Sequence, residues 1–387
     1  MPGFEVIGNE EQAEVNDVFQ RGGVLFRHGF DDRRDGCYKV RQFEQEFAKA
    51  MGVEYALAVS SGTAALRVAL AALRLAPGDE VITQSFTFVA TVEAVIEAGL
   101  VPVCCEVDAT LNIDPEDLMR RITPKTKAVI AVHMLGTPAR MVEIEAVCAE
   151  YGLTLIEDAA WGCGGRLQNK PLGTWGRMGT FSFDFAKTMT TGEGGMVVFH
   201  NREDFEKAAA WHDHGHENNP SVPRWEDTRS SSGFNYRMME LQGAVGLAQL
   251  LKLPRVVEAQ RRNRDRMIEA ISELPGLALR EVPEHSYETA DALIFFVKDI
   301  DAARRCRKEL MNVNLTTKIL PEALTWHFAA AWDHMPQLVA AHGGGLQQAF
   351  PQSQALLSRS VSLPVLVEMQ DDIPQRIRSA LEKALDA

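Results

Sequence analysis

From residue 55 to residue 199, short apolar runs alternate with longer stretches in which apolar residues recur at helical spacing. This alternation predicts a mostly parallel sheet with helices on both faces, which is an α/β fold. The carboxyl ends of parallel strands share one edge of such a sheet, and ligands bind there. The predicted strands are 55–59, 80–82, 101–106, 128–133, 154–157, 180–183 and 195–199, and the predicted helices are 63–75, 88–98, 115–121 and 141–151.

The rest of the chain predicts an arm before this sheet and a smaller unit after it. Residues 1–35 form the arm, and the polar stretch 218–233 is expected to be a long loop. Two long helices should follow, 238–253 and 255–274, because Pro254 interrupts the helical pattern. We therefore expect residues 1–250 to hold the arm and a large domain with a seven-stranded sheet, and residues 251–387 to form a small C-terminal α+β domain. Its elements are expected at 293–297, 302–311 and 374–385.

Composition and charge exclude several classes of protein. Apolar residues make up 46% of the 387 residues, which is too many for a disordered chain. The formal net charge of -13 argues against nucleic acid and against an anionic membrane as partners. No signal peptide is visible, and the longest apolar stretch, 64–75, carries two arginines. We therefore expect a cytoplasmic protein.

Lys187 has the most informative surroundings in the chain. It follows the predicted strand 180–183, and glycines at 192, 194 and 195 come after it, which would let the backbone approach a bound ring. An amine attacks a carbonyl carbon only when it is unprotonated, so a lysine used in this way needs a cationic or desolvated setting. Taken alone, a lysine beside a glycine turn is an ordinary surface residue.

Two other strand ends supply what a lysine bonded to an aldehyde cofactor needs. Asp158 ends a buried strand, where a carboxylate must be paired, and a protonated pyridine nitrogen is a suitable partner. Gly62 and Thr63 open a helix directly after a strand, and the free N–H groups there suit a phosphate. Either feature could instead be a plain helix N-cap. Together they predict a pyridoxal-phosphate enzyme in which Lys187 forms the Schiff base and Asp158 keeps the ring nitrogen protonated.

Other residues are candidates for the same site. Ser182 could add a hydroxyl to the phosphate, or it could be a satisfied strand serine. Phe88 could lie flat against the cofactor ring, with Phe86 as its rival and a core position as the alternative for either. Glu157 is expected to face away from the site.

Histidines recur in two places. His212, His214 and His216 alternate, which can place three imidazoles on one face of a strand. No second group of ligands is evident, and the six cysteines lack paired zinc spacing, so we predict a loop that lines the site, no metal, and reduced structural thiols. His327 and His334 lie seven residues apart, on one face of a predicted helix that either packs its tryptophans or caps the substrate.

With these residues identified, the chain resembles the DegT/DnrJ/EryC1/StrS family of sugar aminotransferases. The matching stretches extend from Tyr38 to Leu250, with a looser match beyond. They include 61–66, 87–91, 157–160, 181–183, Lys187, 192–195, 214–215 and 235–238, all in family order.

The resemblance implies the fold-type I aminotransferase architecture and a homodimer with shared active sites. Asn235 would then reach the phosphate of the partner subunit's cofactor, and a twofold contact makes this reciprocal. One position departs from the family, which commonly has Gln or His three residues after the aspartate to meet the ring hydroxyl. This chain has Trp161 there. Since an indole donates one hydrogen bond and accepts none, either Trp161 donates to that oxygen or another group replaces it.

The reaction implied by the resemblance transfers an amino group from an amino acid, expected to be L-glutamate, to a keto or aldehyde carbon of a sugar. Dehydratase relatives have histidine at the lysine position, so Lys187 favours transamination. A non-catalytic regulator that kept the fold would have lost Lys187 or Asp158, and both are present.

The segments 27–34, 212–216 and 326–327 resemble the subgroup that aminates position 8 of 3-deoxy-manno-octulosonate, a sugar acid of lipopolysaccharide. Arginine forks bind carboxylates, which suits such a substrate. Most of the family instead uses nucleotide-linked 3- or 4-keto-6-deoxy sugars, and these are the alternative. The residues expected to bind the substrate are Arg27, His28, His214 and His327.

Overall fold

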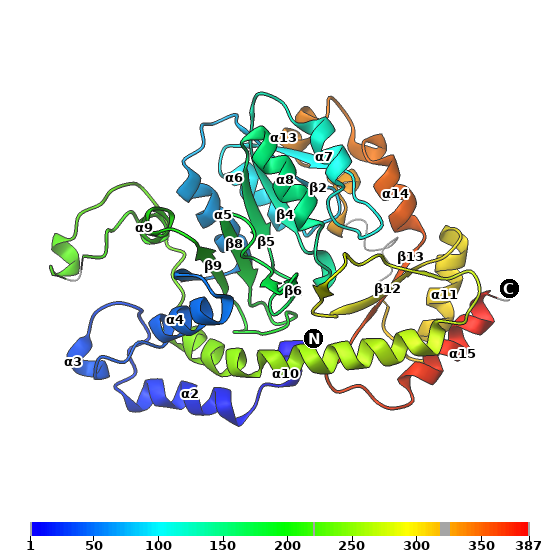
Figure 1. Ribbon diagram of the computed structural model, residues 1–387. Coiled ribbons are helices and arrows are strands. Elements are labelled where there is room, and N and C mark those ends of the chain that lie inside the picture. The colour runs from blue at the N-terminus through cyan, green and yellow to red at the C-terminus, as the bar shows by residue number, and fades with distance from the viewer. Residues whose placement is uncertain (1, 220, 318–325, 386–387) are drawn as a thin grey trace.

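The computed structural model of the protein describes residues 2–219, 221–317 and 326–385. A seven-stranded sheet forms its centre, in the order β1-β9-β8-β5-β4-β2-β3 (Figure 1). Within this sheet only the two pairings of β9 are antiparallel, which confirms the predicted α/β class with a mostly parallel sheet. The strands are β1 (Tyr55–Val59), β2 (Glu80–Gln84), β3 (Val101–Cys105), β4 (Thr126–Val132), β5 (Thr154–Asp158), β8 (Met178–Ser182) and β9 (Gly195–Phe199).

Helices cover both faces of the sheet because the side chains of each strand alternate between them. On β2, Val81 packs with one group of helices, and the next residue, Ile82, packs with the other. Cys104 and Cys105 on β3 divide between two clusters in the same way. One face carries α5 (Gly62–Leu73), α6 (Ala90–Glu97) and α9 (Arg202–Trp211), and the other carries α4 (Lys39–Met51), α7 (Pro115–Arg121) and α8 (Met141–Tyr151).

The N-terminal arm contains short helices, of which α2 packs along α10 (Glu240–Ile271). Lys252 of α10 holds it there through ion pairs with Glu10 at 3.0 Å and Glu11 at 2.7 Å. The long loop predicted after α9 is present, and it projects away from the sheet (Figure 1). The helices of these two segments are α1 (Pro2–Glu5), α2 (Asn9–Gln20), α3 (Asp31–Arg34) and the 3-10 turn η2 (Arg224–Glu226).

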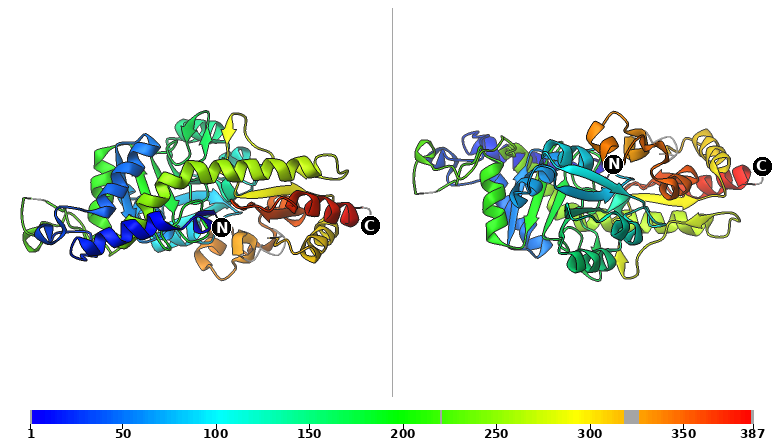
Figure 2. Two further views of the ribbon diagram at one scale, coloured as in Figure 1. Left: turned by 90° about the horizontal axis from the view of Figure 1, so that it is seen from below. Right: turned by 90° about the horizontal axis from the view of Figure 1, so that it is seen from above.

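The prediction of two helices separated at Pro254 is wrong, because α10 is one helix of 32 residues that crosses the molecule (Figure 2). Pro254 is exposed and removes only the hydrogen bond to the carbonyl four residues earlier. Leu253 and Val257 lie on either side of it and are buried in the same core cluster. This packing keeps the helix continuous through the proline.

A smaller antiparallel sheet follows α10, as predicted, with helices packed against its strands. The division after residue 250 stays a prediction, and that residue lies inside α10. The small sheet contains β10 (Ala278–Leu279), β12 (Ala292–Phe296) and β13 (Ser360–Pro364), and its helices are α11 (Ile300–Asn312) and α15 (Ile373–Leu385). A third sheet joins β6 (Arg166–Leu167), β7 (Lys170–Pro171) and β11 (Ser286–Tyr287).

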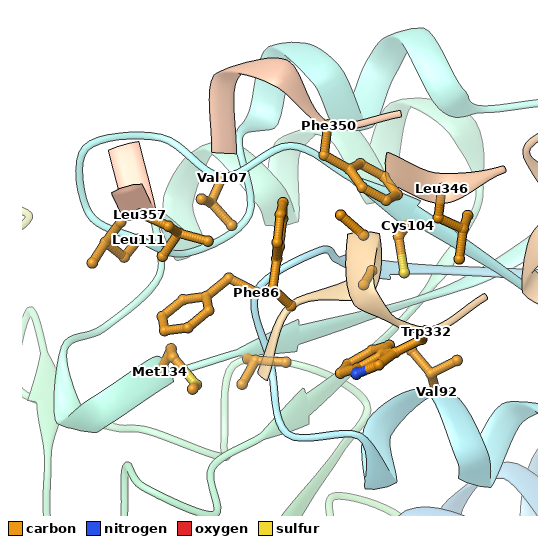
Figure 3. Close-up of a cluster of buried hydrophobic side chains, with 14 of the residues drawn as sticks. Phe86, Val92, Cys104, Val107, Leu111, Met134, Trp332, Leu346, Phe350 and Leu357 are labelled. Atoms are coloured by element: carbon orange, nitrogen blue, oxygen red, sulfur yellow. The ribbon is translucent and has the colours of Figure 1, made fainter. Parts of the chain in front are cut away.

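A cluster of buried side chains joins the end of β2 to segments near the C-terminus (Figure 3). Phe86 packs there with Trp332 and Phe350, and Val92 of α6 and Cys104 of β3 complete the contact with the large sheet. The C-terminal segments include η3 (Ala329–Ala331), α13 (Pro336–Ala341), η4 (Leu346–Gln348) and α14 (Pro351–Ser358).

The helix predicted to carry His327 and His334 on one face is wrong within the described residues 326–334. Phe328 bridges to Phe86, and the chain then turns through η3. Trp326 and His327 are helical, but the helix ends at His327, whose carbonyl accepts the N–H of Thr87 from the loop after β2 at 2.8 Å. Among the residues described, no helix has the length and apolar character needed to cross a membrane.

Candidate active site

Several of the predicted residues meet at the carboxyl edge of the sheet. α5 begins at Gly62, directly after β1, and the Ser61 hydroxyl caps it by accepting the N–H of Ala64 at 3.1 Å. A Cβ on Gly62 would lie 2.6 Å from Cβ of Ser182, so this helix start lies against the end of β8. The N–H groups in the first turn of a helix have no acceptor within that helix. Those of Gly62 and Thr63 are therefore available to donate hydrogen bonds to a ligand at this edge of the sheet.

Asp158 is the last residue of β5 and is 5% exposed. Its Oδ2 accepts the hydroxyl of Thr91 at 2.9 Å, and its Oδ1 accepts the N–H of Ala160 at 3.2 Å. Burial raises the pKa of Asp158, while these two hydrogen bonds and the charge of Lys187 act against that rise. A positive partner for this buried carboxylate would offset the cost of its desolvation.

Thr91 is a site residue that the sequence reasoning missed. It lies on α6, four residues after Thr87, and the two hydroxyl oxygens are 2.8 Å apart. The spacing places both on one face of a helical turn, which was the available signal. Through Thr91 this turn fixes the orientation of the Asp158 carboxylate.

Glu157 faces away from the edge, as predicted. Its carboxylate lies 2.9 Å from Nε2 of His133 and accepts the N–H groups of Gly173 at 2.7 Å and Gly176 at 2.8 Å. The carbonyl of Asp158 in turn accepts the N–H of His133 at 3.1 Å. The side chains of these two adjacent acidic residues thus point to different places, Glu157 into the core and Asp158 to the carboxyl edge of the sheet.

Lys187 lies five residues beyond β8 and is 9% exposed. Its Nζ is 3.3 Å from the centre of the Trp161 ring. The sequence left open whether the Trp161 N–H donates to the ring hydroxyl oxygen of the cofactor or another group replaces it, and it did not predict that the ring face would meet the lysine. Trp161 is itself buried, in the cluster that also contains Trp332.

The two candidate phenylalanines occupy different environments. Phe86 is fully buried in the cluster of Figure 3, so its ring is a core element. Phe88 is 44% exposed, and its ring centre lies 5.7 Å from that of His327. The structure therefore brings Phe88 and His327 together next to the loop after β2, where the Phe88 ring is partly exposed.

The residues proposed to bind substrate near the arm have internal partners. The Arg27 guanidinium donates to the carbonyl of Ala58 at 3.0 Å and to Glu44 at 2.8 Å, and it lies 3.3 Å from Nε2 of His212. His28 lies 3.1 Å from the carboxylate of Asp213. Burial lowers the pKa of His28, and it lowers the pKa of His212 to about 3.

The three alternating histidines do not share one face. His212 is buried against Arg27, His216 lies 3.1 Å from Asp227, and His214 is exposed with a left-handed backbone (φ 55). Asn235 is also exposed, and its side-chain oxygen accepts the N–H of Arg237 at 3.4 Å. His214 and Asn235 thus lie on either side of the projecting loop, where the N–H of His214 donates to the carbonyl of Phe234 at 3.1 Å.

Comparison with known proteins agrees with this geometry. The model of the DegT/DnrJ/EryC1/StrS aminotransferase family matches residues 7–382. The chain belongs to this family. It is therefore a pyridoxal-phosphate-dependent sugar aminotransferase, as its relatives are.

Two relatives and one solved structure illustrate the similarity. The chain is 32% identical over 381 residues to GDP-perosamine synthase of Vibrio cholerae, covering 97% of this chain and 96% of that protein. It is 32% identical over 385 residues to the spore coat polysaccharide biosynthesis protein SpsC of Bacillus subtilis, covering 95% and 92%. An aminotransferase from Psychrobacter cryohalolentis superposes with a TM-score of 0.86 at 27% identity, over 98% of this chain and 97% of the other.

The residues at the edge suit pyridoxal phosphate on physical grounds. The buried Asp158 carboxylate gains from a cationic ring nitrogen, and the start of α5 directs N–H donors at a phosphate. A Cβ on Gly195 would lie 2.3 Å from the carbonyl oxygen of Ser61, so β9 approaches this helix start as closely as glycine allows. Lys187, whose Nζ lies at the same edge, would be the amine that bonds to the aldehyde of the cofactor.

Proposed function

We propose that this enzyme transfers an amino group from L-glutamate to a keto or aldehyde carbon of an anionic sugar. The observation that carries the proposal is the convergence of Lys187, Asp158 and the first turn of α5 at one edge of the sheet. These residues come from separate parts of the sequence, and packing brings them together.

Bound pyridoxal phosphate supplies an electron sink for the carbon that loses its proton. Asp158 would keep the ring nitrogen protonated through an ion pair, and the first-turn N–H groups of Gly62 and Thr63 would hold the phosphate together with the Ser182 hydroxyl. Nζ of Lys187 takes the proton from the α-carbon of the amino donor and returns a proton as general acid. Phe88, which is partly exposed at this edge, would be the aromatic side chain that packs against the ring.

The first candidate substrate is an 8-oxo-3-deoxy-octulosonate sugar acid destined for lipopolysaccharide. It is supported by the resemblance of the segments 27–34, 212–216 and 326–327 to the subgroup that uses this sugar. The Arg27 guanidinium already contacts Glu44 and His28 lies against Asp213, so the proposed substrate contacts fall first to His214 and His327.

The second candidate is a nucleotide-linked 3- or 4-keto-6-deoxy sugar. The similarity to GDP-perosamine synthase over nearly the whole chain favours it. A sugar dehydratase is the alternative reaction, and it would release ammonia without forming an amino sugar.

We also propose that the active enzyme is a cytoplasmic homodimer in which Asn235 completes the partner's phosphate site. Phe234 and Met239, close to Asn235 in the chain, are exposed apolar side chains that a second copy would cover. Lys187→Ala and Asn235→Ala proteins, each inactive, are expected to regain activity when they are unfolded and refolded together. One site of each mixed dimer then has both native residues, and no recovery would contradict shared sites.

The central test compares Lys187→Ala with Lys125→Ala, a control at an exposed lysine. The Lys187 variant is expected to lose the visible absorbance of the cofactor-bound protein and all turnover, while the control keeps both. Wild-type protein converted by L-glutamate to the amine form is then offered the sugar acid and nucleotide-linked keto sugars. The sugar that restores the original spectrum is the substrate, and full activity of Lys187→Ala would refute the proposed function.

A further inference from the structure

The contact between Lys187 and Trp161 has no place in the mechanism above. Nζ lies 3.3 Å from the ring centre, which is well inside the range of a cation–π interaction. We propose that Trp161 is a positioning residue whose indole face holds Lys187 whenever its released amine carries a proton, that is, after it has taken up the proton of the amino donor and before it returns one. This inference rests on the proposed function, because only a lysine that is released and recaptured needs such a place.

The turn that carries Trp161 leaves the indole little freedom. The N–H of Ala159 donates to Thr180 at 2.8 Å, and the carbonyl of Trp161 accepts the Thr289 hydroxyl at 3.1 Å. Gly164 follows with φ 91, and a Cβ there would lie 2.9 Å from Val257 of α10. Since the backbone is held on both sides of Trp161 and the indole ring is buried, one face of the ring lines the site in a fixed orientation.

An indole face suits this task better than a hydrogen-bonding group would. It attracts the cation through its quadrupole, yet it accepts no proton and no conventional hydrogen bond. Lys187 can therefore keep its proton while close to Trp161, because the indole does not accept it, and can deliver that proton to the substrate. The charge of Lys187 also interacts with the carboxylate of Asp158. His133, which directly follows β4, is a further titratable group that acts on Asp158.

The interaction is tested on the full-length protein freed of cofactor, by acetylating lysines over a range of pH and measuring Lys187 by peptide mass spectrometry. Exposed Lys125 of the same molecule is the internal reference. Trp161→Leu removes the ring face, and Trp161→Phe keeps a weaker one. Trp332→Leu is the matched control, because it removes a second indole from the same cluster.

We expect the midpoint of the Lys187 reactivity profile to fall in Trp161→Leu by roughly 0.4 to 1.5 pH units. Trp161→Phe should lie between wild type and Leu, and Trp332→Leu should match wild type. Easier access for the reagent would change the plateau at high pH and leave the midpoint where it is. An unchanged midpoint in Trp161→Leu therefore refutes the inference. This readout needs no turnover, so its failure is distinct from failure of the proposed function.

Discussion

Gly62 is the position at which the geometry of the phosphate site can be tested most directly. A Cβ there would lie 2.6 Å from Cβ of Ser182 and 2.9 Å from its Oγ, well short of a normal contact of about 3.5–4.0 Å. Forcing a methyl group into such a contact costs roughly 1–3 kcal/mol. Alanine also gains up to about 1 kcal/mol over glycine in a helix. We therefore expect Gly62→Ala to lower the free energy of unfolding of the cofactor-free protein by about 1–2 kcal/mol.

The assay is urea unfolding followed by circular dichroism, with and without pyridoxal phosphate. Gly345→Ala is the matched control, because it has open space and an ordinary φ of -55, and it should be neutral or slightly stabilising. The strained helix start must shift, so Gly62→Ala should also bind the cofactor more weakly. Adding Ser182→Gly removes the clashing Cβ and Oγ and leaves Cα at 3.3 Å. If that second change does not restore stability, or if Gly62→Ala matches the control, the close approach of α5 to β8 is not what limits this position.

Three further predictions concern the carboxylates and α10. Because burial raises the pKa of Asp158, the folded protein binds a proton that the unfolded chain releases, so this group lowers stability as pH rises from 3.8 through the folded pKa. Asp158→Asn should remove that slope in the cofactor-free protein, measured by urea unfolding at several pH values, and it should abolish stabilisation by added cofactor. Asp213→Asn leaves His28, Arg224 and Arg237 without their shared buried anion, and it should lower the free energy of unfolding by about 3 kcal/mol or more. Pro254→Ala restores a helical N–H at an exposed position and should raise the free energy of unfolding by about 1–3 kcal/mol. A loss of stability in this variant would show that the proline is needed for the course of α10.

The large sheet could be predicted from the sequence because its signal is local. Each strand is a short apolar run, and each helix has its own periodicity, so no distant contact has to be known. These apolar runs predict where β1 and β5 end, and they therefore also predict the positions of Gly62 and Asp158 at the edge of the sheet. The family resemblance added what local patterns cannot supply, which is the chemical role expected of each residue.

The features that the sequence did not predict all depend on contacts between distant segments. α10 continues through Pro254 because side chains on both sides of it are buried in one core. The segment after residue 326 forms no long helix because its backbone bonds to the loop after β2. Likewise, the orientation of Trp161 depends on a turn held by Thr180 and Thr289, and neither partner is near it in the chain.

The residues proposed for the amino transfer and those proposed to bind the sugar lie in different kinds of structure. Asp158, Gly62 and Ser182 lie at the ends of core elements, where a change of sequence would disturb the sheet itself. His214 and Asn235 are exposed residues that flank the projecting loop, and His327 lies just before the irregular turn at η3, outside the sheet. Loops tolerate substitution far better than sheet ends do. On the proposed function, the choice of sugar would change by replacement of exposed residues in these two segments while the amino transfer at the sheet edge stays intact. Exchanging them with the corresponding segments of a relative should then move substrate preference without loss of the cofactor's absorbance.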